Sequence, residues 1–272
     1  MGKVKIKPSL TDSGRIGDSV LADQLRGAIS GDVFFDSFNR GRYATDASHY
    51  QIEPMGVVVP KTADDVRVAL DIARKENIPL LPRGGGTSQC GQTVGEALVV
   101  DVSKHLNKVL EFDRESESIW VEPGIVLDQL NAFLQPYGLW FPVDVSTSSR
   151  ATIGGMTGNN SCGARSIVYG TMRDNVRAVD AILSNGSEMI FGEVSENFRL
   201  AKLNAEQSDL VSGLLDLGRN EAKEVNRSFP DLMRRVGGYN VDALLPDGPS
   251  RGSWAQNTVN KPHTHPNLAH LL

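Results

Sequence analysis

The sequence predicts an α+β protein made of two small α/β units, and three observations support this fold class. Short valine-rich runs alternate with one amphipathic stretch across residues 55–102, as expected of strands that flank a helix. A second strand-and-helix pattern begins near residue 118, and Asn185-Gly186 adds a hairpin signal further on. The 272 residues are 40% hydrophobic and 22% charged, an ordinary globular composition that excludes a disordered or coiled-coil protein.

The first unit is predicted to contain three strands and one helix. Residues 55–60 are apolar and rich in valine, which indicates a buried strand. Thr62 and Asp65 have the spacing of a helix-capping box, and apolar residues then recur at helical intervals until Asn77. The other two strands are expected at residues 79–82 and 97–102.

The second unit begins with a strand at residues 118–121. The leucines that follow predict a helix that stops at Gly138, where a left-handed residue is favoured. Asn185-Gly186 separates two strand segments and is the strongest hairpin signal in the chain. A long amphipathic helix is expected at residues 205–227, before Pro230.

These elements predict three regions along the chain. Residues 1–50 form a polar lead, with a short helix at 19–29 and a loop after it. Residues 51–196 hold the two units, as subdomains at about 51–110 and 115–196. Residues 197–272 contain the long helix and a tail at 245–265 whose proline, glycine, serine and asparagine content predicts a loop.

Charge and hydropathy exclude several classes of protein. The net charge of −5 does not provide the basic surface expected of a nucleic-acid-binding protein. The longest apolar runs fall far short of the roughly 20 residues of a membrane span, and the start lacks the apolar region of a signal peptide. Cys90 and Cys162 lack metal-site spacing, and we expect both to be packing residues of a cytoplasmic protein.

The sharpest motif is the run Arg83-Gly84-Gly85-Gly86-Thr87-Ser88, placed directly after a predicted strand. Three glycines in a row let backbone N–H groups converge into an anion-binding nest, with a diphosphate as the natural guest. A tight surface turn is the simpler alternative. The run is not a Walker A motif, because Gly-Lys-Ser/Thr is absent. A Rossmann site with Asp101 as the ribose ligand is disfavoured, since residues 87–96 contain two glycines and no apolar helical stripe.

A second cluster of small residues extends from Thr152 to Gly163. Its glycines, Asn160 and Ser161 suit close packing against a flat heteroaromatic ligand, and a glycine-lined helix packing site is an equal alternative. Among the histidines, His263 and His265 have no companion ligands and predict a solvated loop, and His49 is expected at the surface.

Taken in order, these segments resemble the PCMH-type, vanillyl-alcohol-oxidase-like FAD-binding domain over roughly residues 50–195. Within that superfamily, the chain is most similar to the FAD-linked D-lactate and D-2-hydroxyglutarate dehydrogenases. The matching stretches are Pro54 to Pro60, Arg83 to Ser88 with Gly91 and Gln92, Val121 to Gly124, Ile153 to Gly155 with Asn160 and Gly163, Tyr169-Gly170, Asn185-Gly186, Arg234 to Asn240 and Asn267 to Ala269.

The resemblance implies an α+β fold of two α/β subdomains with FAD between them. It places a first group of residues around the FAD pyrophosphate and ribityl chain: Arg83, Gly84, Gly85, Gly86, Thr87, Ser88, Gly91 and Gln92. It places a second group along the flavin: Asp144, Ser146, Thr152, Ile153, Gly154, Gly155, Asn160 and Gly163. Thr87 stands where some members carry the histidine that attaches FAD, which implies a non-covalent cofactor.

The implied reaction is oxidation of a D-2-hydroxy acid, with hydride passing to FAD and then electrons to an acceptor. Family members continue past the equivalent of Asn267 to Ala269 into a closing strand and a substrate domain, whereas this sequence ends at Leu272. We therefore expect the catalytic base and the carboxylate-binding arginine to lie outside it, and no turnover by the chain alone. Two alternatives stay open: a non-catalytic domain that binds a nucleotide diphosphate or a partner protein, and another reaction on this fold, such as reduction of an enolpyruvyl nucleotide sugar.

Overall fold

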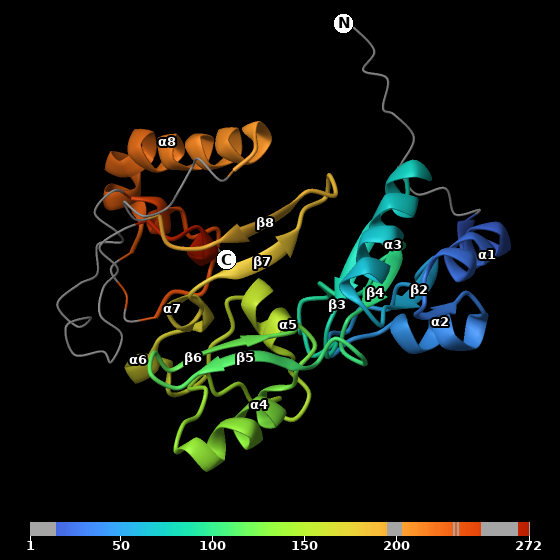
Figure 1. Ribbon diagram of the computed structural model, residues 1–272, viewed down its shortest axis with the longest axis horizontal. Coiled ribbons are helices and arrows are strands. Elements are labelled where there is room, and N and C mark those ends of the chain that lie inside the picture. The colour runs from blue at the N-terminus through green and yellow to red at the C-terminus, as the bar shows by residue number, and fades with distance from the viewer. Residues whose placement is uncertain (1–14, 195–202, 231, 233, 246–265, 272) are drawn as a thin grey trace, which may run out of the picture. The chain divides into compact units, whose positions relative to one another are not determined.

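The computed structural model describes residues 15–194, 203–230, 232, 234–245 and 266–271 (Figure 1). The chain divides into two compact units: unit 1 is residues 1–129 with 149–155, and unit 2 is residues 130–148 with 156–272. No helix in the described ranges is long and apolar enough to cross a membrane. His263, His265 and most of the predicted tail loop lie outside the described residues.

Unit 1 is built on a four-stranded sheet in the order β1-β2-β4-β3. β2, β4 and β3 run parallel, and β1 pairs antiparallel with β2. The sheet strands are β1 (Asp32–Phe34), β2 (Gly56–Val59), β3 (Leu80–Arg83) and β4 (Leu98–Asp101), and the helices are α1 (Ser19–Ala28), α2 (Ser37–Tyr43) and α3 (Ala63–Lys75). The three strands and the helix predicted between residues 55 and 102 are therefore confirmed.

Every residue of β2 and β4 is buried, because apolar side chains cover both faces of the sheet. On one face, Val58 and Leu98 pack with α1 and α3, which Figure 1 shows side by side. On the other face, Val57, Val59 and Val99 pack with Tyr43 of α2. A strand buried on both faces reads as a continuous valine run, which is why these strands were visible in the sequence.

The predicted polar lead is wrong as a separate region, because α1, β1 and α2 all belong to unit 1. The short helix expected at residues 19–29 is confirmed as α1, but the loop after it is a strand and a helix. The predicted boundary near residue 110 also differs from the observed division, since the hairpin of β5 (Val109–Asp113) and β6 (Ser118–Val121) lies in unit 1.

The remaining elements include the predicted helix α4 (Leu127–Leu134), which continues as the 3-10 turn η2 (Gln135–Tyr137) and ends at Gly138 with φ +73°. The hairpin of β7 (Val179–Ile182) and β8 (Glu188–Phe191) confirms the Asn-Gly signal. The other elements are α5 (Ile153–Gly158), α6 (Ser166–Tyr169), α7 (Met172–Asn175), the long helix α8 (Ala205–Ser228), η4 (Val241–Leu244) and η6 (Leu268–Leu271). Met189, Val211, Leu244 and Leu268 form the core that joins β8, α8, η4 and η6.

Two glycines of α8 provide a matched test of this packing. A Cβ on Gly213 would meet nothing within 4 Å, whereas a Cβ on Gly218 would lie 2.2 Å from the carbonyl oxygen of Leu244. We expect Gly213→Ala to raise the free energy of unfolding by about 1 kcal/mol, because alanine favours a helix over glycine. Gly218→Ala should lower it by about 1–3 kcal/mol through overpacking. Urea unfolding followed by circular dichroism measures both, and equal effects would contradict the contact between α8 and η4.

Candidate cofactor-binding site

The glycine run lies in a loop that leaves the carboxyl end of β3 in unit 1. Residues 84–97 are all described and contain no helix, which agrees with the exclusion of a Rossmann site. The backbone N–H groups from Gly84 to Ser88 donate to no acceptor within the described ranges. A run of free N–H groups is the donor set that an anion such as a diphosphate needs, so this loop fits a phosphate-bearing cofactor.

Gly84 and Gly85 bring the loop close to the second cluster, within unit 1. A Cβ on Gly84 would lie 2.1 Å from Oγ1 of Thr152, and a Cβ on Gly85 would lie 2.2 Å from the carbonyl oxygen of Arg150. Left-handed backbone occurs instead at Gly86 and Gly91, with φ of +63° and +75°. Gly85 is therefore needed for the packing of the chain against itself, because a side chain at this position would meet the backbone of Arg150.

Arg83 donates to three backbone carbonyls of unit 1. Its Nη1 donates to Tyr43 and Thr93, each at 3.1 Å, and its Nη2 donates to Thr45 at 2.8 Å. Its guanidinium also lies over the ring of Tyr43, 5.2 Å from the centroid. Burial lowers the pKa of the Arg83 guanidinium from its ordinary value. Through these contacts Arg83 holds the loop against residues 43–45 and 93. The resemblance had instead placed Arg83 beside the FAD pyrophosphate.

Tyr43 and Asp101 anchor the same region from α2 and β4. The hydroxyl of Tyr43 donates to Asp101 at 2.7 Å, and the other carboxylate oxygen of Asp101 accepts from the backbone and hydroxyl of Ser103. Burial and the nearby Asp101 carboxylate raise the pKa of the Tyr43 hydroxyl, so it stays a donor at neutral pH. Sequence reasoning missed Tyr43, because it lies in a stretch that predicted a loop. Sequence reasoning weighed Asp101 only as a ribose ligand. In the structure, both of its carboxylate oxygens accept hydrogen bonds, one from Tyr43 and the other from Ser103.

The segment from Thr152 to Gly155 packs against the turn that follows β6. A Cβ on Gly154 would lie 2.5 Å from Cβ of Pro123, and the Gly154 N–H donates to the Pro123 carbonyl at 2.8 Å. The N–H of Ile153 donates to Ile125 at 2.8 Å, and the N–H of Gly155 donates to Oγ1 of Thr152 at 3.3 Å. The packing alternative thus accounts for the glycine at 154.

In unit 2, Gly163 lies against Asp144. A Cβ on Gly163 would be 2.0 Å from the Asp144 carbonyl oxygen, and the Asp144 side chain accepts from the N–H of Arg165 at 3.1 Å. Ser146 is exposed. Asp144 therefore stabilises the turn at residues 163–165, and its direct contact with a cofactor stays a prediction.

Asn160 of unit 2 carries an unpaired donor. It has φ +44° just after α5, where the N–H groups of Asn160 and Ser161 donate back to Thr157 and Met156 in a Schellman motif. Its side chain is buried, and its Oδ1 accepts from the backbone N–H of Arg173 at 3.0 Å. Its Nδ2 has no acceptor among the described residues. A buried donor without an acceptor costs about 1–3 kcal/mol, so Asn160 fits a ligand that supplies one.

The predicted site residues therefore form separate groups in each unit. Unit 1 brings the loop from Arg83 to Gln92 together with Thr152 to Gly155, and unit 2 brings Asp144 together with Gly163, three residues after Asn160. Ser88 donates to Gln92 within the loop. Cys90 is an exposed free thiol and Cys162 a half-buried one. Within the described ranges, no group of three or more His, Cys, Asp or Glu could hold a metal.

The fold and the glycine loop fit a protein that binds a nucleotide cofactor, and comparison with known proteins identifies its family. Residues 54–192 match the family described as "FAD binding domain", and the chain belongs to that family. FAD is therefore the cofactor for which this domain is built.

Two kinds of relative are similar to this chain. The D-2-hydroxyglutarate dehydrogenase of Escherichia coli (strain K12) is 34% identical over 226 residues, which cover 80% of this chain and 22% of that protein. The glycolate oxidase subunit GlcD of Bacillus subtilis (strain 168) is 39% identical over 163 residues, or 58% of this chain and 34% of that protein. The chain thus spans about a fifth of the length of the D-2-hydroxyglutarate dehydrogenase.

Solved structures show the same fold at lower identity. Alkyldihydroxyacetonephosphate synthase superposes with a TM-score of 0.56 at 22% identity, covering 62% of this chain and 36% of that one. p-Cresol methylhydroxylase superposes with a TM-score of 0.54 at 18% identity, covering 72% of this chain and 38% of that one. Both matches support the PCMH-type α+β fold that the sequence predicted.

Substitution of Arg83 tests whether it braces the loop or contacts the diphosphate. We expect Arg83→Gln to weaken FAD binding by about 10- to 100-fold, because three carbonyls lose their donor and the loop shifts. The ratio of the variant's Kd to the wild-type Kd should stay constant as salt is raised, since the guanidinium acts through neutral carbonyls. Fluorescence titration of FAD at two ionic strengths measures this ratio. A ratio that falls with salt would restore a direct contact between Arg83 and the diphosphate.

Substitution of Gly85 tests the close approach to Arg150. Gly85→Ala should lower the Tm of the ligand-free protein and weaken FAD binding together, because the new methyl group displaces the loop. Gly95→Ala is the matched control, since its Cβ would meet only Cδ2 of Leu81 at an ordinary 3.5 Å. Differential scanning calorimetry and FAD titration of both variants measure the effect. An unchanged Tm in Gly85→Ala, with FAD binding lost, would show that this glycine serves the ligand alone.

Proposed function

We propose that this chain is the FAD-binding portion of a flavin-dependent oxidoreductase that oxidises a D-2-hydroxy acid. The observation that carries the proposal is the run of N–H groups from Gly84 to Ser88 that have no acceptor among the described residues, inside the segment matching the FAD binding domain. A run of backbone donors after a parallel strand suits the diphosphate of FAD and fits the three successive glycines.

The proposed roles follow from the donors that each unit leaves unpaired. The N–H groups of the glycine loop hold the diphosphate, and Arg83, tied to residues 43–45 and 93, fixes the loop that carries them. Asn160 offers its Nδ2 to an acceptor of the flavin. Thr152 and Gly155 shape the backbone beside the glycine loop within unit 1 in this proposal. Bound FAD would accept the hydride, while the protein orients the cofactor and the substrate.

The substrate class is supported by the relatives. Proteins similar to this chain are named for D-2-hydroxyglutarate, glycolate and D-lactate, which all carry a hydroxyl group next to a carboxylate. Because the chain spans only 22% of the first of these relatives, the activity of the whole protein is part of the proposal. Electrons then pass to an acceptor, and a cytoplasmic location stays a prediction.

We propose that FAD is held without a covalent bond. The resemblance places Thr87 where some members carry the attaching histidine, and the loop from Arg83 to Gln92 contains no histidine. Acid precipitation of the FAD-loaded protein is expected to leave the flavin in the supernatant, where its absorbance is measured. Free FAD mixed with denatured protein provides the control. Flavin retained in the washed pellet would show a covalent attachment through another residue.

The reaction is tested on the protein purified from cells that make it. Its bound flavin should bleach anaerobically on addition of D-2-hydroxyglutarate, D-lactate or glycolate, because hydride transfer from the α-carbon reduces the flavin. The L-enantiomers of the two chiral acids are the matched controls. Bleaching by none of these acids, in a protein that carries FAD, would contradict the substrate class and leave the cofactor assignment intact. A protein that carries no flavin would contradict the proposed function itself.

A further inference from the structure

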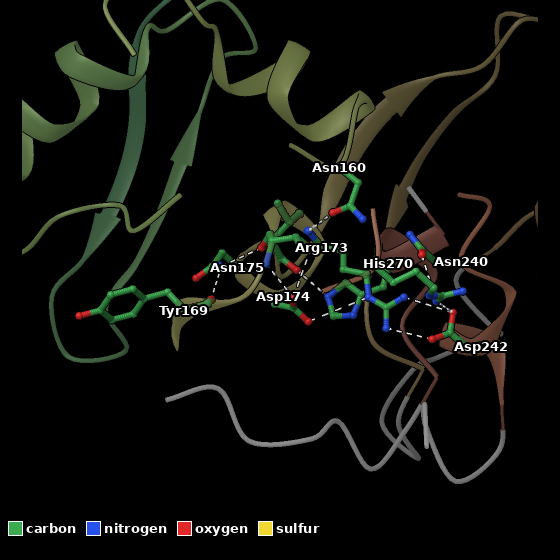
Figure 2. Close-up of polar contacts among 11 residues, drawn as sticks. Asn160, Tyr169, Arg173, Asp174, Asn175, Asn240, Asp242 and His270 are labelled. Carbon is green, nitrogen blue, oxygen red and sulfur yellow. Dashed lines mark hydrogen bonds and ion pairs between the residues drawn. The ribbon is translucent and has the colours of Figure 1, made fainter. Parts of the chain in front are cut away.

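The side-chain amide of Asn160 is held in one orientation by a neighbouring helix. The backbone N–H of Arg173, in α7, donates to Oδ1 of Asn160 at 3.0 Å, as Figure 2 shows. An N–H donor must face the amide oxygen, so this contact fixes which amide atom is Oδ1 and which is Nδ2. The unpaired donor is therefore positioned by Arg173.

Arg173 is itself clamped by a carboxylate 69 residues further along the chain. Its Nη1 and Nη2 donate to the two oxygens of Asp242, at 3.2 and 3.1 Å, in the two-bonded geometry that fits arginine to a carboxylate (Figure 2). The side chains of Arg173 and Asp242 are only 9% and 13% exposed. Separating this pair would leave a buried charge without a counter-charge, which is strongly destabilising.

A second arginine keeps Asp242 in place. Nη2 of Arg235 donates to Oδ1 of Asp242 at 2.5 Å and to Oδ1 of Asn240 at 3.2 Å. The guanidinium of Arg235 lies over the ring of Phe229, 4.2 Å from the centroid. Burial by itself raises the pKa of the Asp242 carboxyl, but the two guanidinium groups outweigh it and hold that pKa below its usual value. Asp242 is thus ionised at neutral pH and bound to both cations.

Resting on the proposed function, we propose that Asp242 is a positioning residue for the flavin, acting through Arg173 on the amide of Asn160. The carboxylate fixes the guanidinium of Arg173, the backbone of Arg173 fixes Oδ1 of Asn160, and Nδ2 of Asn160 is thereby directed at an acceptor of the bound flavin. Asp242 itself does not touch the cofactor in this proposal.

The simpler explanation is that Asp242 only stabilises the packing of η4 against α7. Two readouts separate the alternatives. A residue that acts through Asn160 changes the visible absorption spectrum of the bound flavin, whereas a packing residue changes stability alone. A double-mutant cycle measures whether the effect of Asp242 on FAD binding passes through Asn160.

The cycle combines Asp242→Asn with Asn160→Gly, because glycine accepts the positive φ of position 160 while removing the amide. Asn160→Gly is expected to raise the Kd for FAD about 10-fold and to shift the flavin band, and Asp242→Asn should change both in the same direction. In the Asn160→Gly background, Asp242→Asn should have no further effect on the Kd. Asp216→Asn in α8, which breaks the exposed pair with Arg219, is the control and should change neither the Kd nor the spectrum.

Two more variants cover the loss of folding that removal of a buried charge can cause. Asn160→Asp keeps an acceptor for the Arg173 N–H but removes the amide donor, so it should raise the Kd at least 10-fold without disturbing α7. Arg173→Lys keeps the backbone donor and the charge but cannot form the two-bonded pair, so it should raise the Kd several-fold. Circular dichroism and Tm check the folding of each variant.

Independent, additive effects of Asp242→Asn and Asn160→Gly on the Kd would overturn the proposal and leave Asp242 as a packing residue. An unchanged Kd and spectrum in Asn160→Asp would also overturn it, because the amide donor would then not meet the flavin. Failure of the wild-type chain to bind FAD at all would instead reject the proposed function, and this inference with it.

Discussion

The candidate site in unit 1 depends on how closely two stretches of backbone approach. The Cα of Gly85 faces the carbonyl oxygen of Arg150 at a distance that leaves no space for a methyl group, and Gly84 has the same relation to Thr152. This approach fixes the course of the loop after β3. Within the part of the chain that the structure describes, the backbone N–H groups from Gly84 to Ser88 donate to no acceptor. Packing, rather than added charge, thus makes this loop suited to the anion that we propose.

The part of the fold that could be predicted is the part specified by local pattern. β2 and β4 are buried on both faces and read as valine runs, and the apolar face of α3 recurs at helical spacing. β1 and α2 could not be predicted, because tertiary contacts maintain them. α2 has the sequence SFNRGRY, with poor helix formers, and is held by its cap Asp36 and by Arg40, which donates to the Phe35 and Pro54 carbonyls.

The sequence pointed to a location for the candidate site, which stays a prediction, but it did not show which contacts its residues make. The glycine run pointed to a phosphate, and the free N–H groups of the loop fit that expectation. The sequence could not show that Arg83 is occupied by carbonyls of residues 43, 45 and 93, since those contacts join positions far apart in the chain. The pairing of Arg173 with Asp242 was invisible for the same reason. Sequence identifies residue types suited to a ligand, while only the fold shows which atoms are already used.

The two units use different kinds of donor, and the difference has a physical reason. A diphosphate presents many equivalent oxygens, so a set of backbone N–H groups binds it without any side-chain entropy to lose. A flavin ring presents a few acceptors at fixed positions, and a single side-chain amide must then point in one direction. In the proposed site, Asn160 does so because its oxygen accepts from the Arg173 N–H, which lies in the four-residue helix α7. The capping box of Thr171 with Asp174 holds the start of this helix, and the buried pair with Asp242 holds the side chain of Arg173. An ion pair that contributes little to stability when buried can therefore still determine where a neutral donor points.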